Sequence, residues 1–420
     1  MWPLQIAVYG AGDAGGNGAF PPLQRFLVSQ LEELSKIVTS PRVSAAAQLD
    51  STTGPSLRWV LDPWRRSAPL RMGETNTGDP RELSEFCAWS QRVCPSERHI
   101  LVLSGHGLAF QDNATRQHYA RGAETAQAYR RAKSLFRSNV LGARALLMDE
   151  SDFLTVPELR QALSASTGTF PDRRFDVVVF DACLMSNIEL LYELRETAST
   201  IVGAVDEISG AGLNLAGAAA ILDSAVGRDP LGSNDMAISF AQSYRPQTSS
   251  DSCVAVALDA PRLEAGVSAF ARFAALLGED VATDANRARL AREALAISSR
   301  AMVRYKSKSL ADLGAVAGAM RGIGLPRRTI AALDEAVAAF ASLVIGGRVG
   351  ADYSNALGIS LFAPSGGDHF RLNASDYRAL EFARRTGWLE TLEQLFGDQL
   401  AGASTPYANG STLSPSMLTS

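Results

Sequence analysis

The sequence predicts an α/β protein with a mostly parallel sheet, and three observations lead to this prediction. Short apolar runs recur along the first 260 residues, and segments with helical periodicity separate them. Strands that alternate with helices in this way form βαβ units, whose helices cover both faces of the sheet. Beyond about residue 262 the pattern changes to alanine- and leucine-rich helical repeats, which predict a helical subdomain.

The expected strands are short and rich in Val, Ile, Leu and Ala, which is typical of buried parallel strands. They lie at 4–9, 43–49, 57–61, 99–104, 175–181, 200–205, 253–258 and 357–363. Helical patterns lie at Leu23–Ile37, Pro80–Val93, Val156–Leu163 and Met185–Thr197. We therefore expect an α/β core at 1–261, a helical subdomain at 262–350, a returning strand and helix at 351–401, and a flexible tail rich in small, polar and structure-breaking residues at 402–420.

Composition narrows the function. Lys and Arg number 40 against 44 Asp and Glu, so the net charge of −4 gives no electrostatic reason to expect nucleic acid or membrane as a partner. The four cysteines are too few and too scattered for a disulfide framework or a zinc site. The N-terminus has no signal-peptide pattern. We expect a cytoplasmic protein, or a secreted one if a signal had been removed.

Two of the expected strands are followed directly by residues with reactive side chains. The run Phe175–Asp181 is followed by Cys183, and the run His99–Ser104 is followed by His106 and Gly107. Open α/β sheets place their functional residues at the carboxyl ends of parallel strands. A thiol needs an adjacent base to become an effective nucleophile, so the pattern predicts a Cys/His dyad, with the backbone N–H groups of Gly107 and Cys183 as oxyanion donors. The alternative for each residue is an inert, packed side chain.

The segment 111–147 lies between these two strands and is strongly basic. Such a segment is ordinarily a solvated surface loop or helix. The alternative is a cleavage segment that the protein's own active site recognises. The candidate processing sites are Arg130, Arg131, Lys133, Arg137 and Arg144.

A competing signal follows the first strand. Gly10, Gly12 and Gly15 match the dinucleotide fingerprint G-x-G-x-x-G, and Asp50 ends the second strand. The fingerprint requires a helix that starts at the glycines. Pro21 and Pro22 instead place the expected helix start near residue 21, because proline favours the first turn of a helix. We therefore expect a tight turn here, and a nucleotide-binding oxidoreductase is left as a minor alternative.

Taken together, these pieces resemble the clostripain-like cysteine peptidases, which belong to the caspase-like fold group. The resemblance rests most specifically on Phe175–Met185 followed by the helix Ile188–Leu194. Weaker pieces lie at Val8–Asp13, Asn76–Leu83, Leu103–Gly107, Phe153–Leu159 and Ala356–Pro364. The resemblance implies a caspase-like three-layer α/β/α sandwich, with His106 as general base and Cys183 as nucleophile.

The resemblance also implies that Asp181 helps to form the S1 pocket, where a carboxylate would pair with Arg or Lys at P1. Asp206 and Glu207 follow the next strand, where the family usually has a serine, and they would supply a second acid to the pocket. The alternative for all three is a capping role at strand ends.

These features predict a cysteine endopeptidase that cleaves after basic residues and is synthesised as a zymogen activated by cleavage within 111–147. We expect a protein or peptide substrate inside the cell and an activating partner. Calcium is implied only by the resemblance, and because no loop has EF-hand spacing we expect no obligatory metal or cofactor. The alternative function is a catalytically silent caspase-like scaffold that binds a peptide or a partner.

Overall fold

The structure is a computed structural model of the 420-residue chain. It describes residues 1–12, 23–51, 54–61, 68–110, 144–149, 152–168, 170, 172–208, 212–227, 231–249, 251–301, 309–353 and 356–397, and for 144–149 and 152 the backbone alone. All structural statements below concern these residues. The expected tail at 402–420 lies outside them.

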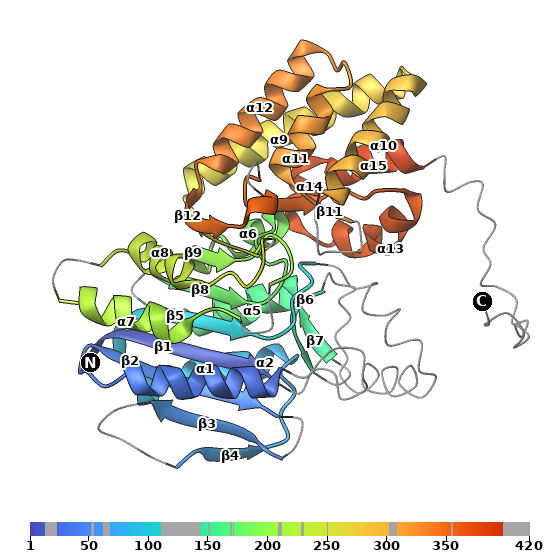
Figure 1. Ribbon diagram of the computed structural model, residues 1–420. Helices are drawn as coiled ribbons and strands as arrows, with labels where there is room; N and C mark the ends of the chain where they lie inside the picture. Colours follow the sequence, from blue (N-terminus) through green and yellow to red (C-terminus); the bar gives the residue numbers. More distant parts are fainter. Residues whose placement is uncertain are drawn as a thin grey trace, which may run out of the picture.

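A large mixed sheet forms the centre of the N-terminal part of the molecule, the lower part of the view in Figure 1. In the described residues it has nine strands, in the order β12-β10-β9-β8-β5-β1-β2-β3-β4. The five central strands, from β9 to β2, are parallel, and two antiparallel strands extend each edge. The bounds are β1 Trp2–Ala11, β2 Val43–Asp50, β3 Ser56–Leu61, β4 Leu70–Gly73, β5 Ser96–Ser104, β8 Phe175–Asp181, β9 Ala198–Gly203, β10 Ser252–Ala257 and β12 Val344–Val349.

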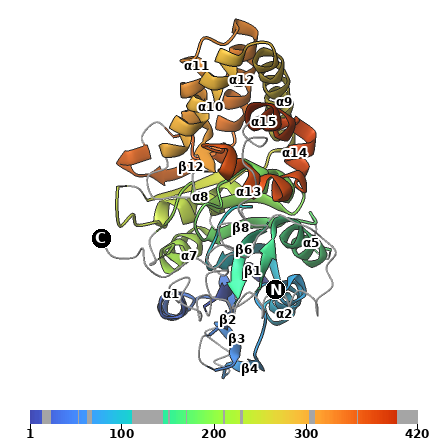
Figure 2. The ribbon, with the colours of Figure 1, turned by 90° about the vertical axis from the view of Figure 1, so that its right-hand side faces the viewer.

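Helices cover both faces of this sheet, as Figure 2 shows with the sheet seen nearly edge-on. The helices α1 (Gln24–Ile37), α7 (Leu215–Ala225) and α8 (Ser233–Ser243) bury apolar side chains against one face. The helices α2 (Pro80–Val93), α5 (Val156–Ser166) and α6 (Ile188–Leu194) cover the other. Successive strand residues point to opposite faces, so each central strand contributes side chains to the apolar cores on both faces of the sheet. The predicted α/β/α sandwich is confirmed.

The C-terminal part is mostly helical and lies beyond the β12 edge of the sheet (Figure 1). Its long helix α9 packs along α12 and α15, and its apolar cluster is continuous with the core around α5 and α6. The bounds are α9 Ala260–Ala282, α10 Ala285–Arg300, α11 Leu313–Arg321, α12 Arg327–Ala341, α13 Gly367–Arg378, α14 Glu381–Thr386 and α15 Trp388–Phe396, with the short 3-10 helix Ala351–Tyr353 before α13. The helical character predicted from the periodicity is present.

Two strands in this part differ from expectation. β12 lies within the expected helical range, yet it pairs with β10 and extends the main sheet. Gly346 and Gly347 interrupt its apolar pattern, and a Cβ on Gly347 would lie 2.7 Å from the Cys253 carbonyl oxygen, so the glycine permits the close pairing. The expected last strand is shorter, β13 (Ser360–Phe362), and pairs with β11 (Leu310–Asp312) in a separate small sheet.

Sequence patterns located most strand centres well, and the errors concern one helix end and several elements that were not expected. The helix expected at Met185–Thr197 is only α6, because Asn187 caps it by accepting a hydrogen bond from the backbone N–H of Leu190 at 3.3 Å. The missed elements are β4, α7, α8, β11 and the hairpin of β6 (Arg144–Asp149) and β7 (Asp152–Thr155). The division of the chain at residue 261 stays a prediction, with α9 beginning at Ala260.

Candidate active site

His106 and Cys183 follow the ends of two neighbouring strands, β5 and β8. These strands pair in parallel, with Ser104 opposite Asp181, so each candidate lies two residues beyond a paired position. Both side chains are half-buried. A Cβ on Gly107 would overlap the carbonyl oxygen of Cys183 and would lie 2.9 Å from the Cβ of Ala182. The structure therefore brings the two predicted strand ends into direct contact.

A side-chain hydrogen bond ties the same two strand ends together. The hydroxyl of Ser104 donates to Asp181 Oδ2 at 2.5 Å, and the N–H of Gly105 donates to the Asp181 carbonyl at 3.2 Å. Ser104 and Asp181 are both buried. Because each precedes a candidate catalytic residue by two positions, this contact holds the His106 and Cys183 segments in register.

The chain turns sharply directly after Cys183. Leu184 has a φ of +66°, a left-handed conformation that costs a non-glycine residue on the order of 1 to 3 kcal/mol. Two backbone hydrogen bonds hold the turn: Leu184 N–H to the Asp206 carbonyl at 3.2 Å, and Ser186 N–H to the Ala204 carbonyl at 2.8 Å. The segment that follows β9 thus fixes the backbone around Cys183.

Cys183 differs from the other three cysteines, all of which the structure describes. Cys87, Cys94 and Cys253 are buried, and only Cys183 is partly exposed. Burial raises the pKa of Cys87 to about 12 and that of Cys253 well above its usual range. The Sγ of Cys183 accepts a hydrogen bond from the Ile208 N–H at 3.4 Å. Cys183 is therefore the cysteine placed to meet a reagent or substrate.

Asp181 is a buried carboxylate that neutral groups surround. Besides Ser104, it accepts hydrogen bonds from the amide of Gln30 at 3.2 Å and from the Leu213 N–H at 2.6 Å. Burial raises its pKa above the ordinary aspartate range, and these three donors oppose that rise. No arginine or lysine of the described residues pairs with it. Within the described residues, the charge of the Asp181 carboxylate is therefore not neutralised by a cationic side chain.

The other two predicted pocket acids lie on the segment after β9. Asp206 is fully buried and accepts hydrogen bonds from the Tyr353 hydroxyl and from the Glu207 N–H, the latter at 2.7 Å. Glu207 is half-buried. The roles of these acids in substrate binding, like the roles of the dyad and of the oxyanion donors, stay predictions.

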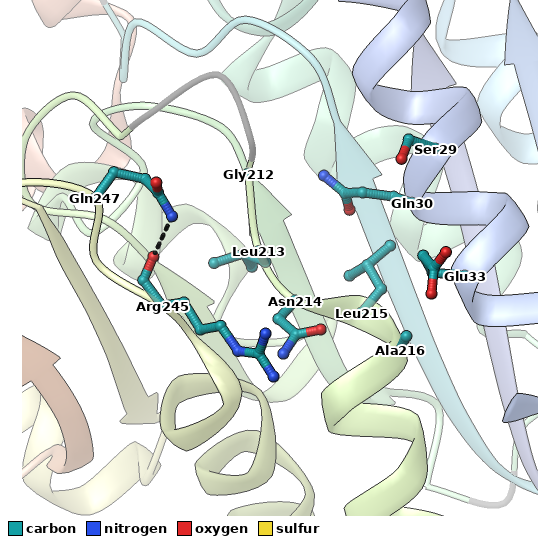
Figure 3. Close-up of a pocket in the computed structure, with 10 residues that line it drawn as sticks. All are labelled: Ser29, Gln30, Glu33, Gly212, Leu213, Asn214, Leu215, Ala216, Arg245 and Gln247. Atoms are coloured by element: carbon teal, nitrogen blue, oxygen red, sulfur yellow. Dashed lines mark hydrogen bonds between the residues drawn. The ribbon is translucent and has the colours of Figure 1, made fainter.

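A pocket of about 190 Å³ lies beside Gln30 and Leu213, two of the hydrogen-bond donors to Asp181 (Figure 3). Gln30, Gly212 and Leu213 line the pocket, and the same three residues lie against the Asp181 carboxylate. Glu33 and Arg245 bring opposite charges to its walls. The sequence offered no signal for Gln30, whereas the equal spacing of Ser104 and Asp181 before the two catalytic candidates was such a signal and was missed.

Gly12, the residue directly after β1, allows close packing against β2. Gly12 donates its N–H to the Asp50 carbonyl at 3.1 Å, and a Cβ on Gly12 would lie 2.5 Å from that oxygen. The helix α1 begins only at Gln24, later than a pyrophosphate site at the glycines requires. Asp50 is buried against Ser51 and Ser56, and burial raises its pKa to about 6. The close approach to β2 explains Gly12, while Gly15 lies outside the described residues.

Comparison with known protein families identifies the family of the chain. A sequence profile of the clostripain family, peptidase family C11, matches residues 135–395, which is well over half of the chain. The chain belongs to the clostripain family. It is therefore a cysteine-type peptidase, a hydrolase whose substrates are peptides or proteins. None of the curated proteins with which the sequence was compared matches it.

Solved structures of clostripain-family proteases share this fold. A secreted C11 cysteine protease from Bacteroides thetaiotaomicron, in complex with an irreversible peptide inhibitor, is 16% identical, with a TM-score of 0.57, and the match covers 92% of this chain and all of that one. An inactive zymogen C11 protease from Parabacteroides distasonis is also 16% identical, with a TM-score of 0.58 and coverage of 92% and 98%. These similarities show the caspase-like fold.

The same structures correct one expectation. The sequence led us to expect a cytoplasmic protein, but two of the similar clostripain-family structures are of secreted proteases from Bacteroides thetaiotaomicron. The cytoplasmic expectation is wrong on this finding. In the described parts of the chain, no helix is long and apolar enough to cross a membrane, and no group of three His, Cys, Asp or Glu side chains is arranged to hold a metal.

Of the predicted processing sites in this clostripain-family chain, only one lies in a described segment. Arg144 begins β6, and its backbone pairs with Thr155 of β7. Arg130, Arg131, Lys133 and Arg137 lie outside the described residues. All five stay predictions.

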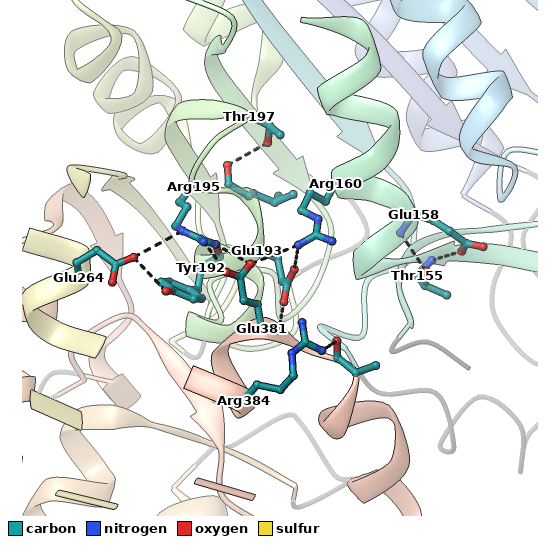
Figure 4. A network of polar contacts seen from close by, with 12 residues as sticks. Thr155, Glu158, Arg160, Tyr192, Glu193, Arg195, Thr197, Glu264, Glu381 and Arg384 are labelled. Carbon is teal, nitrogen blue, oxygen red and sulfur yellow. Dashed lines mark hydrogen bonds and ion pairs between the residues drawn. The ribbon is translucent and has the colours of Figure 1, made fainter. Parts of the chain in front are cut away.

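An ion-pair network anchors α6, the helix that follows Cys183, to the C-terminal part (Figure 4). Buried Glu193 pairs with Arg160 of α5 at 2.8 Å and also accepts the backbone N–H of Glu381 in α14. Arg195 donates two hydrogen bonds to Glu381, at 2.7 and 3.2 Å, and also pairs with Glu264 of α9 at 3.7 Å. The C-terminal helices thereby brace the helix that supports the candidate nucleophile.

Proposed function

We propose that this clostripain-family peptidase is a secreted endopeptidase that cleaves after arginine or lysine through a dyad of Cys183 and His106. One observation carries the proposal. The only partly exposed cysteine of the chain lies at the end of β8, in contact with the His106 segment, two residues beyond a buried carboxylate that has no cation in the described structure.

In the proposed mechanism His106 takes the thiol proton as Cys183 Sγ attacks the scissile carbonyl carbon. The N–H groups of Gly107 and Cys183 stabilise the oxyanion, and His106 gives the proton to the leaving amine as the C–N bond breaks. A thioester remains. His106 then deprotonates a water that attacks the thioester. The C–S bond breaks, the acid product is released, and His106 returns the proton to the Cys183 thiolate.

The preference for a basic P1 residue rests on Asp181. Burial raises the pKa of Asp181, and a guanidinium or ammonium group that reached the carboxylate would stabilise its charged form. Arginine would add the geometry of two parallel hydrogen bonds. Glu207 is half-buried on the segment that touches Cys183, which supports it, with Asp206, as a second acid of the same pocket.

Activation by cleavage within 111–147 is part of the proposal. The similar structure from Parabacteroides distasonis is of an inactive zymogen, which supports a latent form here. Secretion is supported by the two similar proteases that are secreted. We propose a peptide or protein substrate met outside the cell, with no obligatory metal.

The test is hydrolysis of fluorogenic peptides that differ only at P1, with Cys183→Ala as the inactive variant and Cys253→Ala as the matched control. Cys253 is a buried thiol, so its variant should keep activity. Turnover restricted to Arg and Lys at P1, and lost only in Cys183→Ala, would support the proposal. Turnover that survives Cys183→Ala, or that shows no basic preference, would refute it. Mass spectrometry of an intact and fully active chain would remove the zymogen step.

A further inference from the structure

We propose that Gln30 of α1 is a specificity-determining residue, which supports the preference for a basic P1 residue by donating an uncharged hydrogen bond to Asp181. The inference rests on the proposed function, in which Asp181 receives the P1 side chain. Gln30 would act through Asp181, so it is a positioning residue and not a catalytic one.

Gln30 reaches the carboxylate from a separate part of the fold. Its amide Nε2 donates to Asp181 Oδ2 at 3.2 Å across 151 positions of sequence. On the same helix Leu27, Leu31 and Leu34 face the core, and Gln30 lies at the border of that apolar face. Figure 3 shows the side chain extending from α1 toward the segment Gly212–Leu213. A polar residue at this border is explained by the buried carboxylate that it contacts.

The backbone at Gly212 closes over this pair. Gly212 has a φ of +64°, and a Cβ there would lie 2.5 Å both from Asp181 Oδ1 and from Gln30 Nε2, closer than real Cβ contacts allow. The next residue, Leu213, donates its N–H to Oδ1 at 2.6 Å. The amide of Gln30 is therefore held against Asp181 from the side of the neighbouring loop, with little room to turn away.

The chemistry of this shell determines what the site can accept. Gln30, Ser104 and Leu213 supply three neutral donors that stabilise the carboxylate without cancelling its charge. A fixed lysine or arginine at the position of Gln30 would neutralise the carboxylate and repel a basic P1 side chain. A residue without a donor would let burial raise the pKa of Asp181 further, leaving it protonated over more of the pH range. An amide avoids both effects.

Two variants separate these effects. Gln30→Met keeps the length of the side chain and removes the donor, and Gln30→Lys places a cation beside Asp181. The control is Glu32→Gln, an exposed position of the same helix that changes net charge by the same amount as Gln30→Lys. Thermal melts establish that each variant is folded.

The readout is the ratio of kcat/KM for a peptide with arginine at P1 to that for the same peptide with citrulline, measured from pH 5 to 8. Citrulline has the shape of arginine without its charge, so titration of the dyad cancels in the ratio. For Gln30→Met we expect the ratio to fall at acid pH and recover as pH rises. For Gln30→Lys we expect it to fall about tenfold or more at every pH, and for Glu32→Gln to stay as in wild type.

Wild-type ratios in both Gln30 variants would overturn the inference and leave the basic P1 preference intact. A wild-type enzyme that cleaves both peptides equally well would instead refute the role of Asp181 in the proposed function, and this inference with it.

Discussion

The hydrogen bond from Ser104 to Asp181 makes a prediction whose size follows from its surroundings. Ser104→Ala removes one of three donors to a buried carboxylate and leaves the acceptor less well satisfied. A hydrogen bond to a charged group contributes about 1.5 to 3 kcal/mol, so we expect the free energy of unfolding at pH 7 to fall by about 2 kcal/mol.

The pH dependence of that loss has a definite sign. The folded-state pKa of Asp181 is already raised by burial, and removing Ser104 raises it further. A raised carboxyl pKa leaves stability unaffected below the pKa of the unfolded chain and lowers it progressively as pH rises from that value towards the folded-state pKa. The cost of Ser104→Ala should therefore be smaller near pH 3.5 than at pH 7.

Urea unfolding at the two pH values measures this difference. Ser90→Ala is the matched control, because Ser90 is equally buried but its hydroxyl donates to the neutral Cys87 carbonyl at 2.9 Å. The control should lose about 1 kcal/mol at both pH values. An equal loss at both pH values in Ser104→Ala, or a loss no larger than that of the control, would refute the view that Asp181 is a buried anion held by neutral donors.

Three further outcomes are expected. Iodoacetamide should label Cys183 in the folded protein and Cys87 only after denaturation, because Cys87 is buried and its pKa is raised to about 12. Peptide mapping that found both cysteines labelled alike in the folded protein would contradict this. Gly107→Ala should lower kcat/KM at least about 100-fold, because its Cβ would displace the Cys183 backbone, and a variant with wild-type kinetics would disprove that contact. Arg195→Met should lower the free energy of unfolding by about 1 kcal/mol at pH 7 and by less at pH 3.5, as measured by urea titration. The reason is that the hydrogen bond from Arg195 lowers the pKa of half-exposed Glu381. A loss that does not depend on pH would contradict this.

Local pattern was sufficient for most of the framework. Parallel strands buried on both faces must be apolar throughout, so β5 and β8 could be recognised as continuous runs of Val, Leu, Ile and Phe. The edge strand β12 could not be recognised, because Gly346 and Gly347 interrupt its apolar run, and Gly347 is needed for the close pairing with β10. α7 was missed as well, since its small apolar residues carry little periodic contrast.

The sequence by itself determined which residues end the strands, and hence that Cys183 and His106 would lie at one edge of the sheet, because the period of a strand and the direction of parallel pairing are local properties. Only the tertiary structure decided what surrounds them. The donors around Asp181 come from α1, from β5 and from the segment before α7. Such contacts depend on how distant elements pack, and among these donors only Ser104 had a signal in the sequence, its spacing before His106.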